Sequence, residues 1–225
     1  MTQHNTIYGL SVESQWEKIL EIHALKLAKE YRPDWYRWRL TNNYERAVFL
    51  KGDPVYPRES ARYIWANQNV WGENILEVGC STGYGSQFLP TNMNYWGLDY
   101  DPIIIDVAYE QDWGPNRFFK CFDINHHNIS NQDTIIAFEV IEHLDNGLEV
   151  VEKLKKNCKR LLISVPHNEP VGFWGEHHKL HGLNESHFPE FKINYCSEHG
   201  FVSDKPQPIS DQNRFNLMLM RLDNE

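Results

Sequence analysis

The sequence predicts an α/β protein built on a doubly wound, mostly parallel β-sheet. Short apolar runs alternate with helix-like segments between residues 74 and 165, and this alternation indicates parallel strands joined by helices. One apolar run, Ile75–Val78, leads into the glycine-rich turn Gly79–Gly85, as a buried strand does when it opens into a tight, ligand-accessible loop. At 225 residues, the chain is long enough to bury one large core.

The composition argues against several classes of function. With 22 basic and 31 acidic side chains, the formal net charge is −9, which disfavours nucleic acid as a partner because such binding relies on a basic surface. The polar N-terminus is not a signal peptide, and no apolar run reaches the length of about 18 residues that a membrane helix needs. The four cysteines are widely spaced, so we expect reduced thiols in a cytoplasmic protein without a membrane partner.

Residues 1–70 are expected to form a helical lid, and residues 71–225 the sheet domain. Ser14 and Glu17 have the spacing of a helix capping box. The face of the first helix is expected to consist of Trp16, Ile19, Leu20, His23 and Leu27. Aromatic and arginine residues alternate over 31–39, a pattern that suits either stacking on a sugar or base, or sealing a helical layer onto the core. Another helix is expected over 58–69.

The glycine-rich turn does not fit a dinucleotide. The dinucleotide fingerprint would need glycine at the positions of Ser81 and Tyr84. Glu77 brings a negative charge to the turn, which suits a ligand that carries a positive group better than a pyrophosphate.

The second expected strand, Asn94–Leu98, is followed by Asp99. Asp99 lies 20 residues after Gly79, near the separation of about 20 residues at which an acidic side chain meets a ribose in nucleotide-binding α/β units. A carboxylate can accept hydrogen bonds from two neighbouring hydroxyl groups. We therefore predict that Asp99 binds a ribose diol.

Two segments resemble motifs of the class I S-adenosylmethionine-dependent methyltransferases. Residues Glu77–Gly83 (EVGCSTG) resemble motif I of that family, E/D-x-G-x-G-x-G, with Ser81 in place of the middle glycine. Residues Glu139–Leu144 (EVIEHL) resemble the strand-end motif of ubiquinone-biosynthesis-type O-methyltransferases. The resemblance covers about residues 70–222. It implies a Rossmann-like, seven-stranded sheet with an antiparallel last strand, and S-adenosylmethionine as the cofactor, with S-adenosylhomocysteine as its product.

The resemblance also implies a set of cofactor-binding residues at the ends of successive strands. Asp123, after the strand expected over 117–122, would accept from the adenine amino group, with Ile124 against the ring. A fourth strand is expected over 134–138. The whole set comprises Glu77, Gly79, Ser81, Gly83, Asp99, Tyr100, Asp123, Ile124, Phe138 and Glu139.

The EVIEHL segment carries side chains that can do chemistry. Glu139, Glu142 and His143 share one face of a helical turn, and two carboxylates with an imidazole can bind a divalent metal or provide a general base. The same string resembles the metal site of RNA 3′-terminal 2′-O-methyltransferases of small-RNA pathways, in which case the ligands would be Glu139, Glu142, His143 and His181. We expect a site without metal.

A histidine-rich loop follows the fifth expected strand, Arg160–Val165. Five of the 11 histidines stand in this loop: His167, His177, His178, His181 and His187. Histidines titrate near neutrality, and we expect His143, His187 and His167 to supply the base or the acceptor anchor. After the loop, a helix is expected over 191–199, and strands over 201–203 and 214–222.

These observations predict an enzyme that transfers a methyl group from S-adenosylmethionine to a hydroxyl or amine of a small metabolite or saccharide. One alternative is a metal-dependent RNA 3′-terminal 2′-O-methyltransferase. Another is a catalytically inactive module that binds S-adenosylmethionine. The three acidic strand-end residues Glu77, Asp99 and Asp123 favour an active enzyme, because an inactive scaffold has no need of all three.

Overall fold

The computed structural model describes residues 12–41 and 46–224. The α-helices are α1 (Val12–Tyr31), α2 (Pro33–Leu40), α3 (Pro57–Asn69), α4 (Pro102–Glu110) and α5 (Gly147–Lys155), and the short 3₁₀ helices are η1 (Tyr84–Phe88), η2 (Ile141–His143) and η3 (Glu185–His187). The strands are β1 (Asn74–Val78), β2 (Asn94–Asp99), β3 (Arg117–Cys121), β4 (Gln132–Phe138), β5 (Cys158–Pro166), β6 (Lys192–Ser197), β7 (Val202–Ser203) and β8 (Asn216–Asp223).

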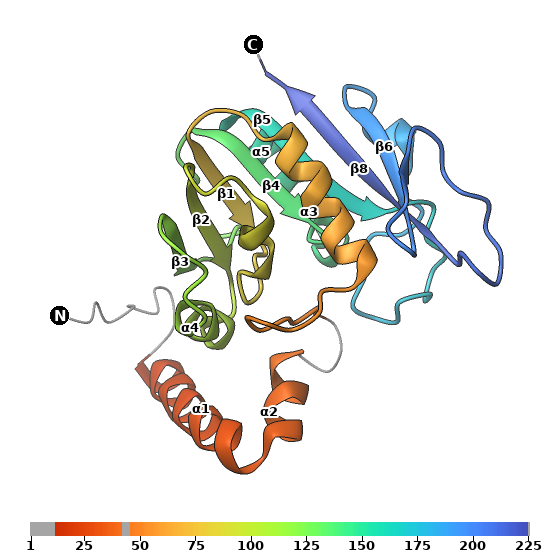
Figure 1. Ribbon diagram of the computed structural model, residues 1–225. Coiled ribbons are helices and arrows are strands. Elements are labelled where there is room, and N and C mark those ends of the chain that lie inside the picture. The colour runs from red at the N-terminus through yellow and green to blue at the C-terminus, as the bar shows by residue number, and fades with distance from the viewer. Residues whose placement is uncertain (1–11, 42–45, 225) are drawn as a thin grey trace.

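The strands form one sheet in the order β3-β2-β1-β4-β5-β8-β6-β7 (Figure 1). Strands β1 to β5 pair in parallel, and β8 pairs antiparallel with both β5 and β6. The predicted doubly wound, mostly parallel sheet with an antiparallel last strand is thereby confirmed. Strand order reverses between β1 and β4, and such a switch point opens a crevice at the carboxyl ends of the strands.

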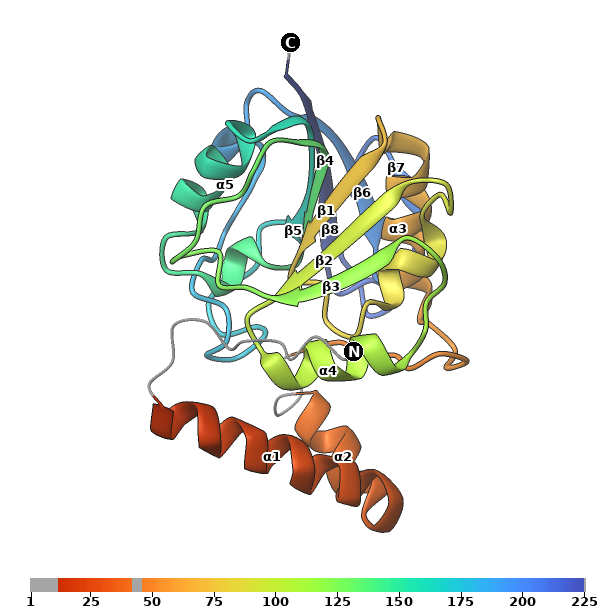
Figure 2. The ribbon, with the colours of Figure 1, turned by 90° about the vertical axis from the view of Figure 1, so that its left-hand side faces the viewer.

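Helices cover both faces of the sheet, with α3 on one side and α5 on the other (Figure 2). Successive residues of β1 point to opposite faces. Ile75 joins the core beneath α3, together with Tyr63 of that helix. Leu76 joins the core beneath α5, together with Val150. Since α3 shares its core with the sheet, the division expected at residue 70 runs between two packed elements, α3 and β1.

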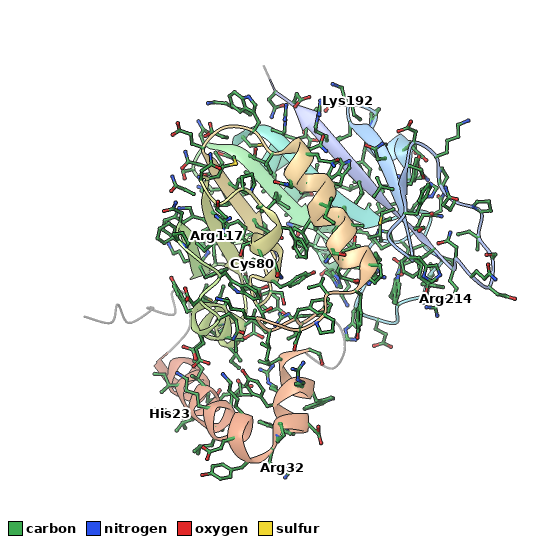
Figure 3. All side chains as sticks on the ribbon, in the orientation of Figure 1. His23, Arg32, Cys80, Arg117, Lys192 and Arg214 are labelled. Atoms are coloured by element: carbon green, nitrogen blue, oxygen red, sulfur yellow. The ribbon has the colours of Figure 1, made fainter. Side chains whose placement is uncertain are left out.

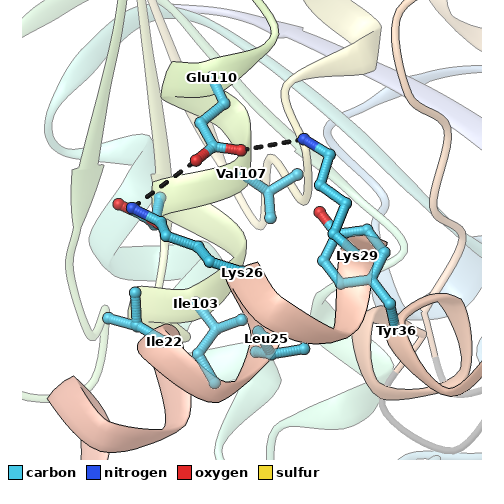
Figure 4. A pocket seen from close by; sticks show the side chains of 9 residues that line it. Ile22, Leu25, Lys26, Lys29, Tyr36, Ile103, Val107 and Glu110 are labelled. Carbon is cyan, nitrogen blue, oxygen red and sulfur yellow. Dashed lines mark hydrogen bonds and ion pairs between the residues drawn. The ribbon is translucent and has the colours of Figure 1, made fainter. Parts of the chain in front are cut away.

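Helices α1 and α2 lie apart from the sheet and pack against α4 (Figures 1 and 2). Leu25 and Ala28 are buried with Ile103 of α4, and Lys26 and Lys29 pair with Glu110 at the edge of the contact (Figure 4).

The predicted apolar face of α1 is wrong. Leu20 and Leu27 are 65% and 63% exposed, whereas Leu25 is 3% exposed. His23 and Ile19 are also exposed, and the side chain of Trp16 lies outside the described residues. The helix docks along Ile22, Leu25 and Ala28, a narrower stripe with i, i+3 spacing.

The helix predicted over residues 191–199 is also wrong, because Lys192–Ser197 forms β6. Strand β6 pairs antiparallel with β8 over its whole length, and this pairing raises the number of strands to eight. Ile193 and Tyr195 face one core, and Cys196 faces the other. Sheet packing on both faces overrides the weak helical pattern of the segment.

Among the described residues, no helix has both the length and the apolar character needed to cross a membrane.

Candidate functional site

The glycine-rich loop after β1 is held by tight backbone geometry. Gly79 has a φ of +73°, and a Cβ atom there would lie 2.3 Å from Cγ2 of Val140. This close approach joins the end of β1 to the end of β4 and requires glycine. Ser81 adopts a φ of 50° although it carries a side chain. Such backbone strain is concentrated at functional sites.

Asp99 closes the other side of this loop. Its side chain is 5% exposed, and its carboxylate accepts hydrogen bonds from the backbone N–H groups of Ser81 at 3.0 Å and Asp101 at 3.1 Å. Burial raises the pKa of Asp99, while the charge of Arg46 and the two amides oppose the rise. The structure thus brings Asp99 to the loop, and its predicted contact with a ribose stays a prediction.

Residues 46–50 lie over the glycine-rich loop. The Oγ atom of Ser81 donates to the carbonyl oxygen of Ala47 at 3.0 Å, and Oγ1 of Thr82 donates to that of Phe49 at 2.7 Å. The guanidinium of Arg46 lies 3.5 Å from Oδ1 of Asp99. Among the described residues of the N-terminal region, this segment therefore contacts both the glycine-rich loop and Asp99. Figure 3 shows Cys80 in the loop after β1, well separated from His23 on α1.

Glu77 lies below the loop, on the side of the sheet that α3 covers. It is 1% exposed, and its two carboxylate oxygens accept hydrogen bonds from the phenol groups of Tyr63 and Tyr95. Burial raises the pKa of Glu77 to about 7. With both oxygens occupied, Glu77 anchors the end of β1 to α3 and β2, and its direct contact with a ligand stays a prediction.

The other predicted cofactor residues lie in different environments. Tyr100 is 60% exposed and stands 5.7 Å from the Arg46 guanidinium, and Ile124 is buried. The Asp123 carboxylate is half-exposed and bonds to the ring of His126 at 2.7 Å. Phe138 is buried in the core beneath α3, where its ring lies 5.3 Å from that of Tyr63, between centroids.

Glu139 ends β4 in a strained conformation, with a φ of 54°. Its backbone N–H donates to the carbonyl oxygen of Ser164 at 3.0 Å, and the Ser164 hydroxyl donates to its Oε1 at 2.8 Å. Hydrogen bonds to β5 therefore fix the bend at Glu139, after which the chain enters η2.

Helix η2 and the histidine-rich loop together form a cluster. Ligand atoms of Glu142, His143 and His178 lie within 4.8 Å of one another. Glu142 is 0% exposed, and among the described residues neither of its carboxylate oxygens has a hydrogen-bond partner. The rings of His143 and His178 meet edge to face, with their centroids 4.6 Å apart.

Backbone hydrogen bonds hold the histidine-rich loop in place. The N–H groups of Lys179 and Leu180 both donate to the carbonyl oxygen of Glu142, at 2.6 and 3.1 Å. The N–H of Gly182 donates to the carbonyl oxygen of Glu169 at 2.9 Å. The Glu169 side chain is buried and binds Nδ1 of His178 at 2.6 Å.

The remaining predicted histidines have other surroundings. His167 lies 3.2 Å from the carboxylate of Glu185, and Nδ1 of His187 accepts from the backbone N–H of Asn184 in a capping box. These two therefore share the turn at 184–187, whereas His143 joins His178. His181 stands 3.7 Å from Oε1 of Glu169, outside the three-residue cluster.

Sequence reasoning did not single out Arg46 or Glu169. A buried glutamate between two prolines, Pro166 and Pro170, carries no sequence signal of its own. The H-x-x-H spacing of 178–181 was a usable signal for His178, but spacing alone does not tell which of the two histidines turns toward η2.

One part of the chain matches a known family. Residues 76–162 match the model of a family described as a methyltransferase domain. The matched region contains the glycine-rich loop, Asp99 and the Glu142–His143 turn. Over these residues the chain is therefore similar to a methyltransferase domain, and its sheet has the Rossmann-like topology of the class I S-adenosylmethionine-dependent methyltransferases, whose cofactor is S-adenosylmethionine.

Comparisons with individual proteins agree with this class. The chain is 29% identical over 126 residues to a probable S-adenosylmethionine-dependent methyltransferase of Mycolicibacterium smegmatis, an alignment that covers 52% of this chain and 42% of the relative. The chain thus spans less than half the length of that relative.

Solved methyltransferases share the fold. The plantazolicin methyltransferase BpumL, in complex with a monoazolic desmethylPZN analogue and SAH, has a TM-score of 0.58 at 15% identity over 93% of this chain and 99% of its own. The N-methyltransferase NodS from Bradyrhizobium japonicum, in complex with SAH, has a TM-score of 0.56 at 17% identity over 74% of this chain and 85% of its own.

The residues at the switch point fit S-adenosylmethionine. The buried carboxylate of Asp99 offers acceptor oxygens of the kind that a ribose diol requires. Tyr100, the next residue in the chain, is 60% exposed and offers an aromatic surface. Access to Asp99 requires that the cofactor share this carboxylate with Arg46 or displace the guanidinium.

Proposed function

We propose that this protein transfers the methyl group of S-adenosylmethionine to a hydroxyl or amine of a small metabolite or saccharide. One observation carries the proposal: the buried Asp99 carboxylate binds the strained loop at Ser81, at the point where strand order reverses. Ligands of open α/β sheets bind in this crevice.

Within the crevice, Asp99 would hold the ribose, and Asp123 with Ile124 would hold the adenine. The loop from Gly79 to Gly83 would pass beneath the rest of the cofactor, and residues 46–50 would cover it. When bound, the cofactor supplies an activated methyl group on a sulfonium. The protein then contributes mainly by positioning the two reactants, an effect worth about 7–11 kcal/mol in favourable cases.

Aromatic side chains next to the histidine cluster support a small acceptor. Trp174 lies 6.3 Å from the His178 ring and 5.0 Å from the Phe215 ring, between ring centroids, and the Arg58 guanidinium lies 5.0 Å from the centre of Phe215. Phe173 is 41% exposed beside them. Flat aromatic surfaces of this kind bind sugars and rings, whereas the net charge of −9 repels a polyanion such as RNA.

A base is needed only if the acceptor is an unactivated hydroxyl. His143, His187 and His167 are the candidates, and His143 is the one that stands on the η2 turn after β4. Its Nδ1 faces the carbonyl oxygen of His177 at 3.3 Å, which favours the tautomer with the proton on Nδ1 and the lone pair on Nε2. An Nε2 lone pair can accept a proton or a hydrogen bond from an acceptor hydroxyl.

The role of Asp99 can be measured directly by calorimetry with S-adenosylhomocysteine. The Asp99→Ala variant is expected to bind about 1–3 kcal/mol more weakly, because hydrogen-bonding groups of the ribose lose their partner. Asp211→Ala, which removes an exposed carboxylate from the turn at 210–213, serves as the control and should bind like the unmodified protein. Equal affinity of a folded Asp99→Ala variant would exclude this residue from the site.

The acceptor class is tested by transfer of a radiolabelled methyl group from S-adenosylmethionine to separate metabolite, sugar and RNA pools. We expect label in a metabolite or sugar fraction. Label confined to RNA would overturn the small-molecule acceptor. If the protein does not bind S-adenosylhomocysteine even at millimolar concentration, the methyltransferase proposal itself fails.

A further inference from the structure

We propose that Glu142, His143 and His178 bind a divalent transition-metal ion. Their ligand atoms converge within 4.8 Å of one another. Two ligands bound about 2.1 Å from one ion lie at most about 4.2 Å apart, so small side-chain rotations are enough to close the site. The inference departs from the metal-free site that the sequence predicts, and it does not depend on the proposed methyl transfer.

The buried carboxylate of Glu142 is the first argument for an ion. Both of its oxygens are fully buried and have no hydrogen-bond partner in the part of the chain that the structure describes, and an isolated carboxylate is costly to bury. The negative charges of Glu139 and Glu169 act on it as well, opposed by the guanidinium of Arg62. A bound cation would supply the partner that these two oxygens lack among the described residues.

The two imidazoles are already oriented as metal ligands usually are. A histidine that binds a metal through one ring nitrogen almost always donates the other N–H to a carboxylate or a carbonyl oxygen. Nδ1 of His178 lies 2.6 Å from Oε2 of Glu169, and Nδ1 of His143 lies 3.3 Å from the carbonyl oxygen of His177. Nε2 is therefore the atom of each ring that would bind the ion. Glu169 acts as a positioning residue for His178.

The ligand set is preorganised by the backbone. The two N–H groups of Lys179 and Leu180 tie the loop to the carbonyl oxygen of Glu142, so that His178 is fixed against η2. Sites whose ligands are held by such supporting contacts need little rearrangement to bind.

The donor atoms select the kind of ion. Two imidazole nitrogens and one carboxylate suit Zn²⁺, Co²⁺, Mn²⁺ or Fe²⁺, whereas Mg²⁺ and Ca²⁺ prefer oxygen ligands only. Three protein ligands leave coordination positions open, and catalytic zinc sites use such a position for water or substrate. With the ion bound, His143 would anchor an acceptor oxygen through the metal rather than take up its proton.

The test is a titration of the chelator-stripped, full-length protein with Co²⁺, followed by visible absorption and repeated without any methyl donor. We expect one Co²⁺ per chain, with a d–d band that Zn²⁺ removes by competition and that Mg²⁺ leaves in place. Glu142→Gln and His178→Ala should each weaken Co²⁺ binding at least about tenfold, since even changes in residues that only support a metal ligand act on that scale. Glu169→Gln should weaken it about tenfold for the same reason.

A matched control is His199→Ala, which removes a histidine whose Nε2 binds the carbonyl oxygen of Gln212, outside the cluster. It should bind Co²⁺ like the unmodified protein. Near-ultraviolet circular dichroism of each metal-free variant shows whether it is folded, and Glu142→Gln, which keeps the shape of the side chain, is the decisive change if His178→Ala fails to fold. The proposal is overturned if the unmodified protein does not bind Co²⁺ or Zn²⁺ at millimolar concentration, or if a folded Glu142→Gln variant binds with unchanged affinity.

Discussion

Glu77 illustrates how a single residue can differ from its sequence interpretation. Its place in the motif suggested a carboxylate turned toward a positively charged ligand. In the structure, two tyrosines, one from α3 and one from β2, donate hydrogen bonds to it under the sheet. The short sequence E-V-G fixes where Glu77 lies along the chain, but the direction of its side chain depends on partners 14 and 18 residues away.

The buried state of Glu77 predicts a pH dependence of stability. Burial raises its pKa from 4.5 to about 7, so the folded protein holds this proton more tightly than the unfolded chain does. The contribution to the free energy of unfolding is therefore complete below about pH 4.5 and is lost as the pH rises to about 7. In Glu77→Gln this part of the decline in the free energy of unfolding should vanish. The dependence of that free energy on pH should then be less steep by up to about 1.4 kcal/mol per pH unit.

Urea unfolding at several pH values between 5 and 8 measures this slope. Glu176→Gln, which replaces an exposed carboxylate in the histidine-rich loop, should leave the slope as it is. An identical slope for Glu77→Gln and the unmodified protein would mean that Glu77 is ionised in the folded state across this range.

Asp99 and the histidines show how far sequence reasoning extends at the residue scale. The position of Asp99 could be predicted because the distance from Gly79 reflects the length of one strand–helix–strand unit, and the structure brings it to the loop. The partner of His143 could not be predicted from the sequence. A loop of more than 20 residues brings His178 back to η2 through backbone hydrogen bonds, and no local sequence pattern encodes these bonds.

At the scale of elements, the buried strands were the easiest to predict. The apolar runs of β1, β4 and β5 are covered on both faces, and such runs are distinctive in sequence. Segment 192–197 was harder, because its pairing with β8 joins two stretches that lie far apart in the chain. Helix α1 was misjudged because it has apolar residues on two faces, and only the contact with α4 decides which face is buried.

A pair of leucines on α1 tests this docking. Leu25 is 3% exposed and Leu27 is 63% exposed. Leu25→Ala should lower the free energy of unfolding of the protein, or the free energy of docking of α1, by about 2 kcal/mol or more. This is the usual cost of a cavity in a packed site. Leu27→Ala should change the stability by no more than about 0.5 kcal/mol, as surface substitutions do.

The measurement for both variants is chemical unfolding, followed by the circular dichroism of the helices. The same side chain is removed on the same helix, so helix propensity changes equally in the two variants. Equal losses would show that α1 does not dock on α4 through Leu25.

At the scale of the whole molecule, the candidate site residues lie at one edge of the sheet. The loops after β1, β2, β4 and β5 all leave from the carboxyl ends of parallel strands. Asp99, Ser81 and the Glu142 cluster therefore gather around one switch point, although they come from different parts of the chain. The antiparallel last strand was predicted from the resemblance to a known family, because buried runs alone reveal that strands exist and not how they are arranged.

This architecture predicts an ordered hierarchy of local stability. Strands β1, β4 and β5 each have a hydrogen-bonded neighbour on both sides and helices over the faces of their sheet, so their amides should open only when the whole domain unfolds. Helices α1 and α2 pack on α4 and not on the sheet, and should open by themselves with a much smaller free energy. Native-state hydrogen exchange followed by mass spectrometry, under conditions where reclosing is fast, measures both. Helix α5 is the internal control, because it is only one residue longer than α2 but packs on the sheet, and it should exchange more slowly than α2. If peptides from α1 exchanged as slowly as those from β4, the N-terminal helices would have to unfold together with the sheet.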